Sequence, residues 1–225
     1  MLMRFCLFVI IVIFTASVSN ANVFYDDGQP HTFQDSINGS LYVDYEVPQS
    51  TGTTVDIIDP AVVGDTLFTF GTSRVNLSGG SIQGGQYISG IVADDFSCIA
   101  IVGGTVGDTI VGLADSFFDI SGGNITADMV IAAGEVGCYD TSTFKFHGTD
   151  FKIDSIPVDY GIYNAQYKSS GILSGKLADG TTFESSFTIY DGGSIVLVPE
   201  PTSLSMFLVG MQIFAWRRKK SKQST

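Results

Sequence analysis

The sequence predicts an all-β protein, built as a short right-handed parallel β-helix of about five coils. Three observations favour this fold class. Gly has about twice its usual share in residues 22–200, apolar residues alternate along short segments, and one segment pattern recurs five times. Frequent Gly, Thr, Ser, Val and Ile with few Lys disfavour helices and favour short strands joined by tight turns.

The recurring pattern is an apolar–x–apolar segment, a turn that is often Gly-Gly, and then a further apolar residue. Its five copies begin at Val55, Val75, Ile99, Phe118 and Phe144, with separations of 20, 24, 19 and 26 residues. Gly-Gly at a fixed offset supplies the positive φ that a tight corner requires. A unit of about 22 residues cannot bury its own apolar face, so we expect the units to stack.

A second apolar strand is expected between successive copies, over residues 67–70, 87–92, 109–113 and 129–133. The Gly-Gly segments resemble the short repeats of exported β-helical surface proteins. Because the spacing varies from 19 to 26 residues, an antiparallel β-sandwich with irregular hairpins stays open as the alternative fold.

The segments outside the repeats are expected to close the ends. We expect an N-terminal cap over 22–50, the repeat region over 51–151 and a C-terminal cap over 152–198. The C-terminal cap is expected to consist of two β-hairpins, with turns at Asp179-Gly180 and Asp191-Gly192-Gly193. Caps are expected because an open end exposes unpaired strand edges.

Residues 1–21 have the three parts of a secretory signal peptide. Arg4 is the cationic part, residues 5–16 form the apolar run, and Ser19 and Ala21 are the small residues at positions −3 and −1. We therefore expect cleavage after Ala21 and export of the protein.

The C-terminal segment, residues 199–225, has three parts in a fixed order. Pro199-Glu200-Pro201 comes first, then an apolar stretch over 204–216, then a basic end that begins with Arg217 and Arg218. The apolar stretch predicts a short transmembrane helix, and the basic end predicts that the tail stays on the cytoplasmic side of the inner membrane. The two Pro residues prevent a strand or helix from continuing through the motif.

This C-terminal segment resembles the PEP-CTERM sorting signal. The resemblance implies that the chain is a substrate of exosortase, a membrane-embedded cysteine protease, which would cut near Pro199-Glu200-Pro201. It also implies a membrane-anchored precursor, followed by delivery to the cell surface or extracellular matrix, often beside exopolysaccharide production. Glu200 is accordingly interpreted as a recognition element for the protease.

The charge is unevenly distributed along the chain. The whole chain has a formal net charge of −12, but residues 22–200 contain five cations against all 23 acidic residues and carry −18. Nucleic acid is therefore excluded as a partner, because binding to phosphates needs clustered cations.

The chemistry-bearing residues predict no cofactor, no metal site and no catalytic residue. Cys98 and Cys138 lie in neighbouring repeats and could form a disulfide in an exported protein, or remain two buried thiols. Asp94-Asp95 and His147 resemble parts of polygalacturonase-like sites, in which paired carboxylates act as acid and base. A small β-helical carbohydrate-active enzyme would require Asp94, Asp95 and His147 to meet in one cleft.

We therefore expect an exported, acidic, non-enzymatic protein with a structural or adhesive role at the cell surface, linked to exopolysaccharide. The first alternative is a polysaccharide-binding module, which a row of exposed aromatic side chains would favour. Tyr87, Phe96 and Phe117 are the candidates that the sequence offers for such a row. The second alternative is the carbohydrate-active enzyme.

Overall fold

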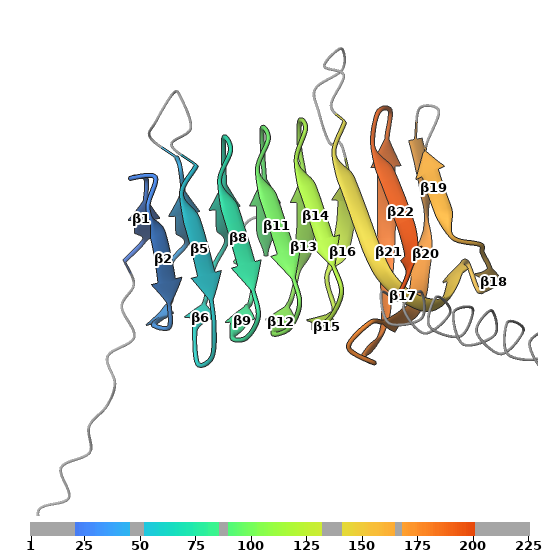
Figure 1. Ribbon diagram of the computed structural model, residues 1–225, viewed down its shortest axis with the longest axis horizontal. Helices are drawn as coiled ribbons and strands as arrows, with labels where there is room; N and C mark the ends of the chain where they lie inside the picture. Colours follow the sequence, from blue (N-terminus) through green and yellow to red (C-terminus); the bar gives the residue numbers. More distant parts are fainter. Residues whose placement is uncertain (1–20, 46–51, 86–89, 132–140, 165–167, 201–225) are drawn as a thin grey trace, which may run out of the picture.

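A computed structural model describes residues 21–45, 52–85, 90–131, 141–164 and 168–200. Within these ranges the protein is all-β, with 22 strands and no helix. Most strand pairs are parallel, and the strands follow one another side by side along the long axis of the molecule (Figure 1). Because the chain visits the same three sides in turn, its strands fall into three stacks.

The first stack forms one side of the body. Its strands are β1 (Val23–Tyr25), β4 (Leu41–Val43), β7 (Leu67–Thr69), β10 (Ile91–Ala93), β13 (Thr109–Gly112), β16 (Asp128–Ile131) and β21 (Thr182–Tyr190). Each pairs in parallel with the next in this order. In most of these strands a single central side chain points outward between two buried ones, as expected for the period of two in a strand.

The second stack contains the repeats that the sequence predicts. Its strands are β2 (Pro30–Phe33), β5 (Thr54–Ile57), β8 (Arg74–Leu77), β11 (Cys98–Ile101), β14 (Phe117–Ile120), β17 (Thr143–Ile153) and β22 (Ser194–Pro199), again all parallel. The five predicted repeat starts are direct register partners: Val55 pairs with Val75, then Ile99, Phe118 and Phe144. The predicted alignment of the repeats is confirmed.

The third stack consists of two-residue strands, the last three of which follow Gly corners. Its strands are β3 (Ser36–Ile37), β6 (Val62–Val63), β9 (Ser81–Ile82), β12 (Thr105–Val106) and β15 (Asn124–Ile125). Gly80, Gly104 and Gly123 directly precede the last three strands and have φ of 72°, 76° and 91°. A Cβ on Gly80 would lie 2.6 Å from the carbonyl oxygen of Ala61 in the preceding repeat, so the corner needs Gly for space as well as for φ.

The core lies between the three stacks and runs the length of the body. It is built from rows of buried side chains, and each row contains the residues at the same register position of successive strands. One row of the second stack contains Phe33, Ile57, Leu77, Ile101, Ile120, Phe146 and Leu197, all buried. Phe118 and Phe144 in the adjacent row stack at 4.2 Å between ring centroids. Each repeat is stabilised mainly by its neighbours, because its apolar side chains contact the next layer.

The C-terminal end departs from this pattern and nearly closes the large sheet on itself. The second half of β17 leaves the second stack and pairs antiparallel with β20 (Lys168–Leu177), which in turn pairs antiparallel with β21 of the first stack. β18 (Ile156–Pro157) pairs with the end of β17, and β19 (Gly161–Asn164) pairs antiparallel with β22. β17 therefore connects the first and second stacks around one end.

Two predicted parts of the fold differ from the structure. Residues 23–43, within the predicted N-terminal cap, contain β1 to β4, and these strands continue all three stacks in register. The sequence did not reveal this, because His31 is polar at a position that is apolar in the next repeat, where its partner is Val55. Thr32 pairs with Asp56, so its position is polar in both repeats. The antiparallel sandwich, the alternative fold, does not describe residues 23–131, where the strand pairs are parallel.

One of the two predicted C-terminal hairpins is confirmed and the other is wrong. β20 and β21 form the hairpin at Asp179-Gly180. β21 and β22, in contrast, continue the first and second stacks in parallel with β16 and β17. The turn between them, in which the Gly193 amide donates to Tyr190, repeats the corner in which the Ser97 amide donates to Asp94. Ile189 and Ile195 point inward and are buried in the stacks. A hairpin of β21 and β22 outside the stacks would leave these side chains more exposed to water, which is less favourable.

Candidate functional sites

The point where the body meets its C-terminal tail is well defined. β22 lies between two strands. It pairs in parallel with β17, up to the register partners Gly148 and Pro199, and antiparallel with β19. Pro199 is the last residue of the strand and the first of the Pro-Glu-Pro motif. Glu200 follows it directly, while Pro201, the predicted membrane helix over 204–216, Arg217 and Arg218 lie outside the described residues. The body therefore leads into the tail without a spacer.

Side chains of the C-terminal end surround this junction. The Tyr160 hydroxyl donates a hydrogen bond of 3.3 Å to the carbonyl oxygen of Gly148, the register partner of Pro199. Tyr160 also borders a cavity of about 240 Å³ that Phe151, Lys152 and Val158 help to line. Ile156 and Ile162 nearby are 67% and 68% exposed, among the most exposed large apolar side chains of the described chain.

An aromatic patch forms a second feature, on the outer side of the first stack near the N-terminal end. Phe24, Tyr42 and Phe68 are register partners at the outward positions of β1, β4 and β7. Their rings stack at 4.7 and 4.9 Å, each pair within 10° of parallel. Tyr45 and Phe70 lie beside them, and Tyr45 contacts Tyr42 and Phe70 edge-on at 5.1 and 5.3 Å.

The rings of the patch differ in what they offer to a ligand. The faces of the stacked rings pack against one another, so mainly the ring edges face outward. Tyr45 is tilted by 53° to 64° from its neighbours and is 54% exposed, so its orientation differs from that of the stack. Beyond the patch the same outward row continues with Val92, Val111 and Val130, which makes it apolar over six strands.

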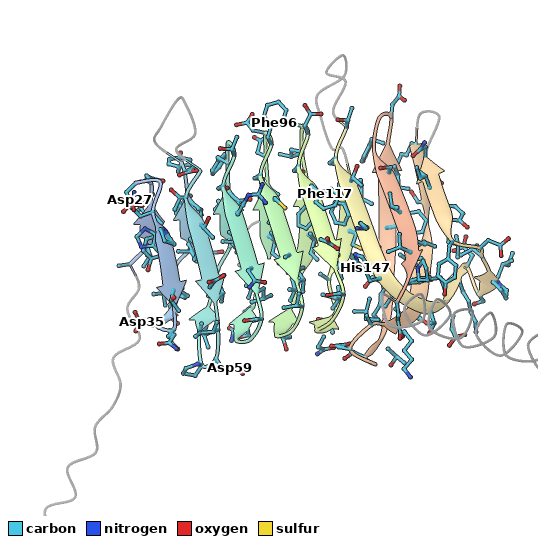
Figure 2. All side chains as sticks on the ribbon, viewed as in Figure 1. Asp27, Asp35, Asp59, Phe96, Phe117 and His147 are labelled. Carbon is cyan, nitrogen blue, oxygen red and sulfur yellow. The ribbon has the colours of Figure 1, made fainter. Side chains whose placement is uncertain are left out.

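The sequence did not identify this aromatic patch. Its members are 18 and 26 residues apart, so no local motif marks them. An alignment of the second strand of each repeat would have found them, because Phe24, Tyr42 and Phe68 all follow an inward apolar residue. Of the predicted candidates, Tyr87 lies outside the described residues. Phe96 is 66% exposed in the corner before β11, and Phe117 points outward from β14, so these two form no row with the patch (Figure 2).

His147 lies in a small charged cluster on the outer side of the second stack. Its Nε2 lies 2.6 Å from Oδ1 of Asp119, and the Lys145 ammonium lies 3.9 Å from Oδ2 of the same carboxylate. Asp94 and Asp95 are in the corner before β11, at the end where Phe96 lies, whereas His147 lies farther along β17 (Figure 2). The structure therefore does not bring Asp94, Asp95 and His147 into one cleft.

Cys98 points outward from β11, in the row that also contains Arg74 and Phe117. Its thiol is free, and Cys138 lies outside the described residues. Burial raises the pKa of the Cys98 thiol, and the nearby Arg74 guanidinium opposes part of that rise. The possible disulfide between Cys98 and Cys138 therefore stays a prediction.

The described residues contain no group of three or more His, Cys, Asp or Glu side chains arranged to hold a metal ion. In the same part of the chain, no helix is long and apolar enough to cross a membrane. Comparison with known proteins finds no matching family model, no matching curated protein and no matching solved structure.

Proposed function

We propose that this chain is an exported protein of the cell surface or extracellular matrix, with a structural or adhesive role linked to exopolysaccharide, and that exosortase processes it. The body is proposed to be a right-handed parallel β-helix. The observation that carries the proposal is the agreement of two boundaries: the last strand of the body ends at Pro199, where the Pro-Glu-Pro motif begins. A removable sorting tail should begin where the folded body ends.

The character of the body supports a passive role. Rows of buried side chains run through all repeats, and neighbouring repeats are joined by parallel strand pairing over most of the length. The formal charge of −18 on residues 22–200 favours solubility and disfavours binding to anionic surfaces.

Processing is tested by mass spectrometry of the protein exported by its own producing cell. The proposal predicts that the mature protein begins at Asn22 and lacks residues 204–225. A Glu200→Ala variant should accumulate as the tailed precursor, whereas Glu184→Ala, an exposed Glu in β21, should be processed normally. Mature protein that still contains Trp216 would contradict the proposal.

A second candidate function is polysaccharide binding at the aromatic patch. Apolar and aromatic surfaces bind the C–H faces of sugars, and the tilted, half-exposed ring of Tyr45 is the member best placed to do so. The narrow apolar row that continues along Val92, Val111 and Val130 has the shape needed by a single extended chain rather than by a broad protein surface.

This second function is tested by affinity electrophoresis of the exported protein in gels that contain the producer's own exopolysaccharide. Retardation should be lost on Tyr45→Ala. The matched control is Tyr160→Ala, which removes a Tyr ring that is 50% exposed, between β18 and β19 at the other end of the body (Figure 1). Equal retardation of the two variants would argue against binding at the aromatic patch.

A further inference from the structure

An apolar row runs along the outer side of the first stack and crosses six of its strands. Each strand contributes one outward side chain to the row. The members are register partners in neighbouring strands: Phe24, Tyr42, Phe68, Val92, Val111 and Val130. Phe24 is 47% exposed and the others are half-buried. The row is therefore a continuous strip, one side chain wide, that follows the long axis of the body.

Carboxylate side chains flank this apolar row on both sides. Residues two positions apart in a strand point to the same face. Asp128 is exposed two residues before Val130 in β16, and its Oδ1 accepts a hydrogen bond of 2.6 Å from the Ser186 hydroxyl. Asp94 comes two residues after Val92, directly beyond the end of β10. Because the strands are parallel, the start of β16 and the end of β10 lie on opposite sides of the row.

No cationic side chain balances these carboxylates on the described residues of β1 to β16. Arg74 is the only Lys or Arg between residues 22 and 144, and it lies exposed on β8, in the second stack. The outer side of the first stack therefore carries only negative charge over these strands. An anionic polymer would be repelled from the strip, whereas a cationic polymer would be attracted.

The strip has the width and the spacing of a single chain of sugar rings. Neighbouring strands lie about 4.8 Å apart. The stacked rings of Phe24, Tyr42 and Phe68 follow this spacing, with 4.7 and 4.9 Å between centroids. One pyranose ring of an extended chain has a similar length, so successive sugars can contact successive strands. Their C–H faces would then lie on the apolar row, and the substituents at their rims would point toward the carboxylates on both sides.

We infer that the aromatic patch and the apolar row beyond it bind a linear amino-sugar polymer with free, protonated amines, which lies along the body with one ring on each strand. This inference rests on the proposed polysaccharide binding at the aromatic patch and names the class of sugar. The amines pair with Asp94 and Asp128, while Tyr45 contacts a C–H face near the other end of the chain. One exposed ion pair contributes little, so the preference arises from several pairs along one chain.

The test is isothermal titration calorimetry of the exported protein, in mildly acidic buffer, with two hexasaccharides that share one β-1,4-linked backbone. The glucosamine hexamer is cationic, and its fully N-acetylated form is neutral. The glucosamine hexamer should bind about tenfold more tightly, and high salt should reduce this preference. Equal affinities would overturn the inference and leave polysaccharide binding at the patch intact. Absence of binding by both hexamers would also overturn it, and the gel retardation of Tyr45→Ala reports separately on the patch.

Two matched variants locate the contact. Asp128→Asn and Asp56→Asn each remove one exposed carboxylate that accepts a hydrogen bond from the neighbouring strand, and Asp56 lies on the outer side of the second stack. Asp128→Asn should weaken binding of the glucosamine hexamer about threefold, whereas Asp56→Asn should leave it unchanged. Equal losses would mean diffuse attraction to an acidic body and would overturn the site. Hexalysine is the third probe: binding that Tyr45→Ala weakens as strongly as it weakens glucosamine binding would indicate a basic peptide as the ligand and overturn the sugar.

Discussion

Phe118 and Phe117 are adjacent residues of one type that β14 places on opposite sides of the sheet. Phe118 is fully buried, with its ring 4.2 Å from that of Phe144, whereas Phe117 points outward beside Cys98. Phe118→Ala should therefore cost far more stability than Phe117→Ala. The comparison tests the register on which the whole fold depends.

The cost follows from what each ring loses. Removal of a buried Phe ring costs about 3 kcal/mol in transfer from water and cavity formation. The lost stack on Phe144 adds about 1 kcal/mol, so Phe118→Ala should lower the free energy of unfolding by about 4 kcal/mol. Phe117→Ala should lower it by about 1 kcal/mol or less, because its ring is partly exposed in the folded protein.

The assay is urea unfolding of the exported protein, followed by far-ultraviolet circular dichroism, with thermal unfolding as a second measurement. The loss of about 4 kcal/mol expected for Phe118→Ala corresponds to a fall in Tm of about 10 °C for a domain of this size. A double-mutant cycle with Phe144→Ala should give a coupling of about 1 kcal/mol between the two rings. Equal effects of the Phe117 and Phe118 variants would refute the register and the packing argument built on it.

Three further predictions concern a close contact, a carboxylate and a thiol. Gly112→Ala should lower the free energy of unfolding by about 2 kcal/mol in urea titrations, because its Cβ would lie 2.6 Å from Cε2 of Phe144; Val111→Ala, its outward neighbour, should cost less than half as much. At Asp179, burial raises the carboxyl pKa, but hydrogen bonds from Thr181 and Gly123 together outweigh it and hold the pKa below its ordinary value. Stability from this group is therefore present above pH ~4 and lost as pH falls through the lowered pKa, so Tm should fall more steeply below pH ~4 in the wild type than in Asp179→Asn; parallel curves would contradict this. Cys98 should alkylate in the folded protein without reductant, and at pH ~8 more slowly than a free peptide thiol because its pKa is raised, as read by mass spectrometry; alkylation only after reduction would instead support the bridge to Cys138.

The sequence was sufficient for the parts of the fold that repeat locally. Val55, Val75, Ile99, Phe118 and Phe144 mark the same position because inward burial recurs in all five segments. A Gly-Gly corner at a fixed offset follows Val75, Ile99 and Phe118. The repeat formed by β1 to β4 was missed because His31 stands where the next repeats have an aliphatic residue. The His31 ring stacks on Tyr25 at 4.2 Å between ring centroids, at the end of the core. The strand at β22 was predicted, but its parallel pairing with β17 was missed because about fifty residues separate Phe144 from its partner Ile195, and no local pattern spans that distance.

The candidate sites divide in the same way. The Pro-Glu-Pro motif is contiguous, so its place at the end of the body could be anticipated from residues 198–201 alone. The aromatic patch depends on which residues of separate strands face outward at the same register, as Tyr42 and Phe68 do. Tyr45 adds to it from a corner, which no period in the sequence predicts.

The constant register across repeats of unequal length means that the length variation is confined to the corners. Duplication of the 19 residues from Ile99 to Phe117 would add one layer and lengthen the body by about 4.8 Å, with the same neighbours above and below. Neither the closed C-terminal end nor the tail would have to change. The length of the body is therefore a heritable quantity that recombination between similar repeats can change in single, uniform steps.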